Sequence, residues 1–184
     1  MRKLIVNPYQ ALLDACVLAP MPACDSLLLL AQEGFFVPKW SSGILDEVAR
    51  FLRNRDKPEK SIQHRLVSMT EAFEEACIDG YEPLISLMST PDPDDRHVIA
   101  AAVYGRVDVI VTNNLKDFPP ASVEPYGIAV QSLGEFFVHQ YHLDPDLFIQ
   151  VLRKQVEIRK GITYAQLVEN LRKQAPELAA LVQG

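Results

Sequence analysis

The sequence has few cysteines and no long apolar run, and each shortage excludes a class of protein. Its 184 residues include three cysteines, Cys16, Cys24 and Cys77. These are too few and too scattered for a zinc site or a disulfide framework, so we expect reduced thiols of a cytosolic protein. No uninterrupted run of about 18 apolar residues occurs, so no membrane span is expected. The apolar stretch after Met1 is broken by Asn7 and Pro8, a poor fit to a signal peptide.

The sequence also has fewer basic than acidic residues. Eighteen Lys and Arg face 24 Asp and Glu, for a formal net charge of −6. This balance does not favour nucleic-acid binding by bulk charge, but it leaves room for carboxylates gathered around a cation. The charge is uneven, because residues 39–65 are mainly basic and residues 66–95 carry acids but no Lys or Arg. The basic segment either is a solvated helix face or binds an RNA backbone through Arg50, Arg53, Arg55, Lys57 and Lys60.

Predicted strands and helices alternate along most of the chain. The predicted strands are residues 11–13, 35–40, 107–112 and 128–131, with a weaker candidate at 83–85. The predicted helices are residues 22–33, 41–55, 58–76, 95–104 and 132–141. Pro38 suggests a sheet edge or a strand end. This alternation is typical of an α/β fold with a parallel sheet.

The pattern becomes purely helical after residue 139, with helices expected at 145–159, 163–173 and 176–182. We therefore place a domain boundary near residue 140. Residues 1–140 form the main domain, and residues 141–184 form a helical C-terminal extension.

Three acids lie where elements begin, end or pack. Asp14 ends the first predicted strand, where open α/β sheets bind ligands, although Asp is also a common turn residue. Glu47 lies at the border of a helical apolar face, where a rim acid could also lie. Asp95 is in line with the apolar stripe of the helix it begins, although an acid there also suits the helix dipole.

A fourth polar group follows the strongest predicted strand. Thr112, Asn113, Asn114 and Asp117 come just after it, and loop composition alone could explain them. Taken together, two strand ends and two helix edges each supply oxygen ligands. Oxygen ligands without His or Cys select hard cations such as Mg²⁺ or Mn²⁺. Such a site suits metal-assisted hydrolysis of a phosphodiester, in which the cation activates water. His97 lies close to Asp95, and we expect a structural role for it.

Four segments resemble the PIN-domain ribonucleases, in particular the VapC-like toxins of prokaryotic toxin–antitoxin pairs. They are residues 12–18 (LLDACVL), 44–48 (ILDEV), 92–102 (DPDDRHVIAAA) and 109–119 (VIVTNNLKDFP). The resemblance covers about residues 9–138. It implies a three-layer α/β/α sandwich with a central parallel sheet, extended by the C-terminal helices.

The resemblance also implies roles for individual residues. Asp14, Glu47 and Asp95 match the three core metal-site acids of the family, and Thr112 matches its hydroxyl position. Many members place an Asp where this chain has Asn114, so Asp117 is the alternative fourth acid. The implied protein is a cytoplasmic Mg²⁺- or Mn²⁺-dependent endoribonuclease that leaves 5′-phosphate products. Its implied partners are an RNA substrate, a cognate antitoxin protein and, as family members commonly dimerise, a second copy.

Two other functions remain for comparison. A catalytically weak RNA- or protein-binding module would explain why an amide, Asn114, stands in place of an acid. An Asp-nucleophile phosphatase fits less well, because such enzymes typically have a second Asp two residues after the first, where this chain has Cys16.

Overall fold

A five-stranded parallel sheet forms the centre of the computed structural model, which describes residues 9–182. The strands are β1 (Gln10–Leu13), β2 (Val37–Ser41), β3 (Cys77–Ile78), β4 (Val109–Val111) and β5 (Ala129–Gln131). They lie in the order β3-β2-β1-β4-β5, and all four pairings are parallel. The chain moves from β1 outward to β3 and then returns to the other side of β1 as β4. The switch point between β1 and β4 is where open α/β sheets place ligands.

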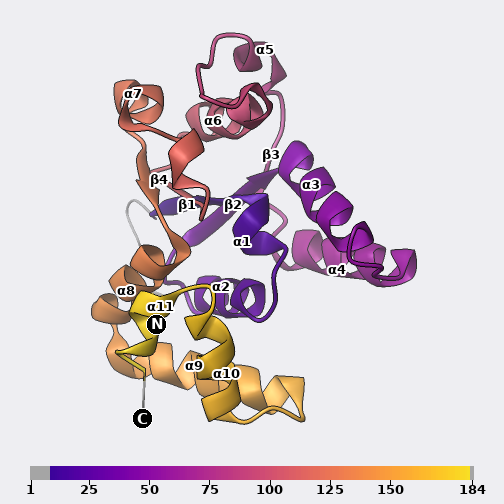
Figure 1. The fold of residues 1–184 in the computed structure, drawn as a ribbon, viewed down its shortest axis with the longest axis vertical. Coiled ribbons are helices and arrows are strands. Elements are labelled where there is room, and N and C mark those ends of the chain that lie inside the picture. The colour runs from indigo at the N-terminus through magenta and orange to yellow at the C-terminus, as the bar shows by residue number, and fades with distance from the viewer. Residues whose placement is uncertain (1–8, 183–184) are drawn as a thin grey trace.

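Helices cover both faces of this sheet. In Figure 1, α6 and α7 lie above the sheet and α2 and α8 lie below it. The helices are α1 (Ala15–Leu18), α2 (Ala23–Gln32), α3 (Ser42–Arg53), α4 (Glu59–Ala72), α5 (Glu82–Ile85), α6 (Arg96–Tyr104), α7 (Pro120–Val123), α8 (Leu133–Leu143), α9 (Pro145–Arg159), α10 (Tyr164–Arg172) and α11 (Pro176–Ala179). Three short 3₁₀ turns are η1 (Pro93–Asp95), η2 (Leu115–Asp117) and η3 (Glu124–Tyr126). The predicted three-layer α/β/α architecture with a C-terminal helical extension is confirmed.

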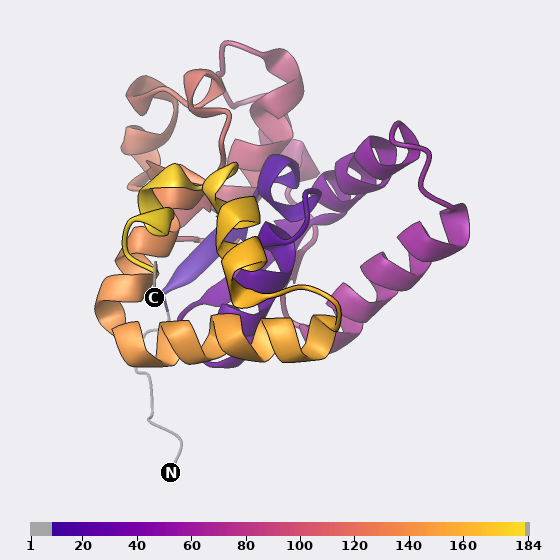
Figure 2. The same ribbon diagram turned by 60° about the horizontal axis from the view of Figure 1, so that its bottom comes forward.

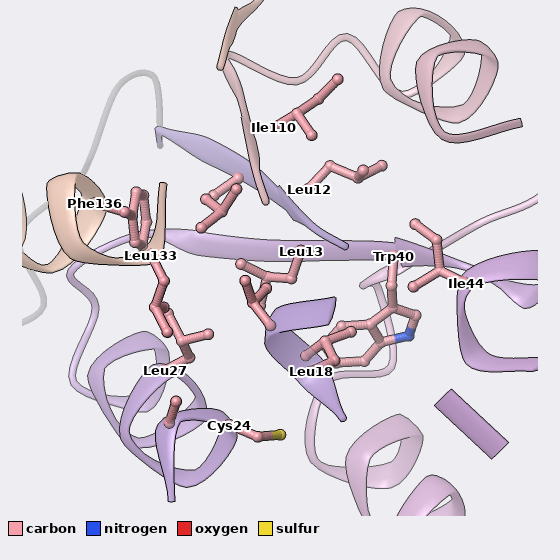
Figure 3. Packing of buried hydrophobic residues seen from close by; sticks show 14 of the residues in the cluster. Leu12, Leu13, Leu18, Cys24, Leu27, Trp40, Ile44, Ile110, Leu133 and Phe136 are labelled. Atoms are coloured by element: carbon pink, nitrogen blue, oxygen red, sulfur yellow. The ribbon is translucent and has the colours of Figure 1, made fainter. Parts of the chain in front are cut away.

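The sheet interior is apolar on both faces, as expected for a parallel sheet covered by helices. Leu12, Leu13 and Ile110 are fully buried in β1 and β4. Figure 3 shows these side chains with Trp40 and Phe136 in the same core. The ring of Phe136 on α8 meets Phe36 edge to face, with centroids 4.9 Å apart. This packing holds α8 against the segment that leads into β2.

Pro38 does not lie in an edge strand. Strand β2 pairs with β1 on one side and with β3 on the other. The Val37 N–H donates to Tyr9 on the β1 side, and the Trp40 N–H donates to Ala76 on the β3 side. Since successive N–H groups alternate sides, the Pro38 nitrogen faces β3, whose pairing begins only at Trp40. The proline therefore removes no ladder hydrogen bond.

The weak strand predicted at residues 83–85 was wrong, because these residues form the short helix α5. The strand in this part of the chain is β3, which has only two residues, Cys77 and Ile78. Two residues are too few to show an alternating or continuous apolar pattern. The remaining predicted strands and helices are present, with ends that differ by a few residues.

The C-terminal helices pack onto α2 and α8 (Figures 1 and 2). Phe148 on α9 is fully buried, and its ring meets the rings of Phe35, Phe137 and Tyr141 edge to face. Val151, Leu152, Leu167, Leu171 and Leu178 belong to the same apolar cluster as the sheet. The boundary near residue 140 remains a prediction. Within residues 9–182, no helix is both long and apolar enough to cross a bilayer.

Polar contacts fix the position of α9 against α2. Two ion pairs flank the contact, one from Arg159 to Asp25 at 2.7 Å and one from Lys154 to Glu33 at 2.8 Å. Between them, the buried side chain of Gln155 accepts a hydrogen bond from Ser26 at 2.7 Å and donates to the Pro22 carbonyl at 3.1 Å. We call these contacts the α2–α9 clamp.

Candidate active site

The candidate site lies at the switch point, where β1 and β4 end side by side. Asp14 follows β1, and its N–H donates to the Val111 carbonyl at 3.1 Å. Thr112 follows β4, and its N–H donates to the Gln131 carbonyl of β5 at 3.0 Å. The parallel pairing of β1 with β4 therefore places the Asp14 carboxylate beside the Thr112 hydroxyl. The hydroxyl donates to Asp14 Oδ2 at 2.7 Å.

The Asp14 carboxylate is buried and has three hydrogen-bond donors. Besides Thr112, Cys16 Sγ donates to Oδ2 at 3.0 Å and the Ala15 N–H donates to Oδ1 at 2.6 Å. Burial raises the pKa of Asp14, the three hydrogen bonds lower it, and the charge of Glu47 raises it further. The pKa is raised overall, so burial outweighs the three donors. The surroundings hold this carboxylate in place without compensating its charge.

Asp95 is the second acid of the site. It ends η1 and precedes α6, but its side chain makes no capping hydrogen bond to the helix. Burial and the charges of nearby acids, first Asp14 and Asp117, raise the pKa of Asp95 to about 6. Asn114 Nδ2 donates to Asp95 Oδ2 over 3.5 Å, a long contact. Asp95 therefore faces the other acids across the site, not its own helix end.

Glu47 reaches the site from α3 and contacts His97. The distance from His97 Nε2 to Glu47 Oε1 is 3.3 Å, and both side chains are mostly covered. Burial lowers the pKa of His97, but the hydrogen bond and the charges of Glu47, Asp14 and Asp95 outweigh burial and raise it. His97 was expected to have a structural role only. Its contact with Glu47 shows that it also touches a predicted site residue.

The loop after β4 completes the site. The Asn114 N–H donates to Thr112 Oγ1 at 3.0 Å, which orients the hydroxyl toward Asp14. Asp117 ends η2 and is 9% exposed. Its carboxylate lies 3.9 Å from the exposed Lys116 ammonium, and its charge contributes to the raised pKa of Asp95. The structure thus brings Asp14, Thr112, Asn114 and Asp95 together by hydrogen bonds, and it brings Glu47 and Asp117 within electrostatic reach.

The chemistry of these donors fits a hard divalent cation. All the predicted ligands are carboxylates. Glu47 lies beside His97 and Asp117 beside Lys116, whereas the charges that act on Asp14 and Asp95 come from other acids. Among residues 9–182, no Lys or Arg pairs with Asp14 or Asp95. A cation would relieve the repulsion that raises the pKa of these acids. In the present arrangement, however, the described residues include no group of three His, Cys, Asp or Glu side chains at metal-binding spacing.

Cys16 is a residue of the site that the sequence did not reveal. It lies two positions after Asp14, and the number and spacing of the cysteines in the sequence do not indicate that Cys16 contacts this acid. The three cysteines are free, as predicted. The only sequence signal was its position in the segment 12–18 that carries the family resemblance.

The basic segment is only partly available to a ligand. Arg53 forms two hydrogen bonds of 2.8 Å with Glu59, and Arg55 stacks over the Phe51 ring at 4.4 Å. Arg65 donates to the carbonyls of Leu18 and Ala19, which ties α4 to the end of α1. These three arginines have structural contacts of their own.

Comparison with known proteins agrees with this geometry. The PIN domain profile matches residues 10–116, which include every strand from β1 to β4. A Mycobacterium tuberculosis protein described as "Putative ribonuclease VapC50" is 38% identical over 103 residues, which are 55% of this chain and 60% of that protein. The chain thus matches less than two thirds of that relative. No solved structure matches. Because the PIN domain profile matches more than half of its residues, this chain belongs to the PIN domain family.

Proposed function

We propose that this chain is a divalent-metal-dependent endoribonuclease and the toxin of a toxin–antitoxin pair. The observation that carries the proposal is the buried, uncompensated carboxylate of Asp14 at the switch point of a PIN-domain sheet, with Asp95 and Glu47 facing it. The relative described as a ribonuclease supports the choice of reaction.

Asp14, Glu47, Asp95 and Asp117 would hold Mg²⁺ or Mn²⁺. A cation bound there would polarise the scissile phosphate and activate water. Thr112 keeps Asp14 oriented through the 2.7 Å hydrogen bond, and Asn114 in turn orients Thr112. Asn114 stands where many family members have an acid, and it contacts Asp95 through a neutral amide. We therefore assign the fourth carboxylate to Asp117.

The substrate would lie across the carboxyl ends of β1 and β4. Arg50, Lys57 and Lys60 are exposed cations on or near α3 and α4, and we propose that they contact the RNA backbone. Contacts of this kind position a nucleic acid without reading its sequence. Arg53 and Arg55 are weaker candidates, because Glu59 and Phe51 already occupy them.

The test is cleavage of a fluorescently labelled RNA by the purified protein. We expect cleavage with Mg²⁺ or Mn²⁺, none with EDTA, and a loss on the order of a hundredfold or more for Asp14→Asn. Asp146→Asn is the matched control, because Asp146 is an exposed acid in the first turn of α9. Equal cleavage by Asp14→Asn and the wild-type protein would contradict the proposal.

A non-catalytic binding module is the second candidate. The neutral amide of Asn114 favours it, as does the absence, among residues 9–182, of three His, Cys, Asp or Glu side chains grouped as metal ligands. Isothermal titration separates the two functions. Retained RNA or partner binding without Mn²⁺ binding at millimolar metal would favour the module. For the toxin assignment, we expect a small antitoxin protein to bind this chain and to block cleavage. We also propose a cytoplasmic location and a homodimer, which sedimentation velocity tests.

A further inference from the structure

The thiol of Cys16 lies at the centre of the hydrogen bonds around Asp14. Its sulfur is 3.0 Å from Asp14 Oδ2 and 3.3 Å from Thr112 Oγ1. The sulfur also accepts the Asn113 N–H at 3.2 Å. The side chain therefore links the residue after β1 to both residues after β4.

The thiol acts as a donor toward Asp14. A thiol keeps its proton at neutral pH, because its ordinary pKa is about 8.5. The Cys16 sulfur lies 3.0 Å from Asp14 Oδ2, within reach of a hydrogen bond from this proton. Because Asp14 accepts and cannot donate when ionised, the S–H bond points to its oxygen.

The donors are shared unequally between the two oxygens of Asp14. Oδ2 accepts from both Thr112 and Cys16, whereas Oδ1 accepts only from the Ala15 N–H. A carboxylate oxygen has about two acceptor sites. Oδ2 is therefore saturated, and Oδ1 retains one acceptor site.

A second contact holds the thiol itself in place. Asn113, whose N–H donates to Cys16, also accepts the Leu133 N–H through its Oδ1 at 3.0 Å. Leu133 is the first residue of α8 and is fully buried. The orientation of Cys16 is thus tied to the packing of α8 on the sheet.

We propose that Cys16 is a positioning residue: with Thr112, it saturates Oδ2 of Asp14 and so presents Oδ1 to the cation. This inference rests on the proposed function, because it assigns a role to a neighbour of a proposed ligand. The competing interpretation is that Cys16 only fills space beside the sheet.

The two interpretations predict opposite orders for two variants. Cys16→Ser keeps a donor, and Cys16→Ala removes it but suits an apolar space. If Cys16 positions Asp14, Ala weakens Mn²⁺ binding about tenfold and lowers kcat by a similar factor, as for the loss of other partners of metal ligands. Ser then stays within about threefold of the wild-type protein in both measurements. Isothermal titration gives the affinity, and a melting curve of each variant shows that it folds.

Cys77→Ala is the matched control. The Cys77 thiol also donates to a carboxylate two residues away, Asp79, at 3.5 Å. Asp79 follows β3 and is not one of the proposed metal ligands. We expect Cys77→Ala to bind Mn²⁺ and to cleave RNA like the wild-type protein.

Two results would overturn the inference while leaving the proposed function intact. One is a wild-type Mn²⁺ affinity and kcat in Cys16→Ala. The other is an equal or greater loss in Cys16→Ser than in Cys16→Ala, which indicates packing. If the wild-type protein binds no Mn²⁺, or binds it as well as Asp14→Asn does, the proposed metal site fails and the positioning role fails with it.

Discussion

Carboxylates lie close to other charged groups in two regions of this molecule, and the charges of those groups differ between the two regions. In the α2–α9 clamp, Asp25 pairs with Arg159 and Glu33 pairs with Lys154. At the ends of β1 and β4, the neighbours of Asp14 and Asp95 include other acids, and the pKa of both residues is raised. The clamp supplies its own counter-charges and serves the fold. At the switch point, no Lys or Arg among residues 9–182 pairs with Asp14 or Asp95, so these two carboxylates remain available to a cation.

The largest expected effect is a loss of stability when the apolar packing of α9, the helix that carries half of the clamp, is removed. Phe148→Ala removes a fully buried ring that packs on Phe35 and Phe137. We expect the free energy of unfolding to fall by about 3–5 kcal/mol. Urea unfolding measures this change. A fall below about 1 kcal/mol would mean that the C-terminal helices contribute little to the stability of the sheet.

Next in size is the response of the acid site to metal. Mn²⁺ should stabilise the folded protein by about 2.7 kcal/mol at a concentration one hundred times its Kd. Thermal melting with and without Mn²⁺ measures the effect. Asp14→Asn should reduce the shift strongly, whereas Asp25→Asn should leave it unchanged. Equal shifts in both variants would remove the distinction between the two regions.

Removing a carboxylate charge should change the free energy of unfolding in opposite directions in the two regions when EDTA is present. Asp25→Asn breaks the pair with Arg159, whose partners are each about a third exposed, and should cost at most about 1 kcal/mol. Asp14→Asn removes a buried, uncompensated charge and should raise the free energy of unfolding. Parallel urea titrations compare the two. A loss of stability in Asp14→Asn would show that its hydrogen bonds outweigh the cost of burying its charge.

The smallest expected effect is a dependence of stability on pH in the presence of EDTA. The pKa of Asp95 is about 6 in the folded protein and about 3.9 in an unfolded chain, so the folded state binds the proton more tightly. Stability should therefore rise modestly as the pH falls from about 7 to about 5. Asp95→Asn should reduce this slope without abolishing it, because the raised pKa of His97 acts in the same direction. If the stability of Asp95→Asn depends on pH as steeply as that of the wild-type protein, the raised pKa of Asp95 is contradicted.

The sequence predicted the features that rest on local chemistry. Asp14 and Thr112 follow strands with clear apolar runs, and a parallel sheet places such residues together. The helices predicted to begin near residues 41 and 132 are present, and the hydroxyls of Ser41 and Ser132 cap them, as a hydroxyl before an apolar periodic segment commonly does.

Features that depend on tertiary contacts were missed. Strand β3 is two residues long, so its pairing with β2 defines it and its own pattern does not. The roles of Cys16 and His97 depend on partners 96 and 50 residues away, Thr112 and Glu47. No local pattern reports such distances.

The buried amide of Gln155 has a consequence for how the extension docks. Shifting α9 by one helical turn along α2 would separate Gln155 from Ser26 and from the Pro22 carbonyl, and these polar groups would lose their partners. Each buried polar group left unpaired costs about 1–3 kcal/mol. These hydrogen bonds therefore favour a single register between α2 and α9. Should two copies exchange their extensions, each extension would have to dock in that same register.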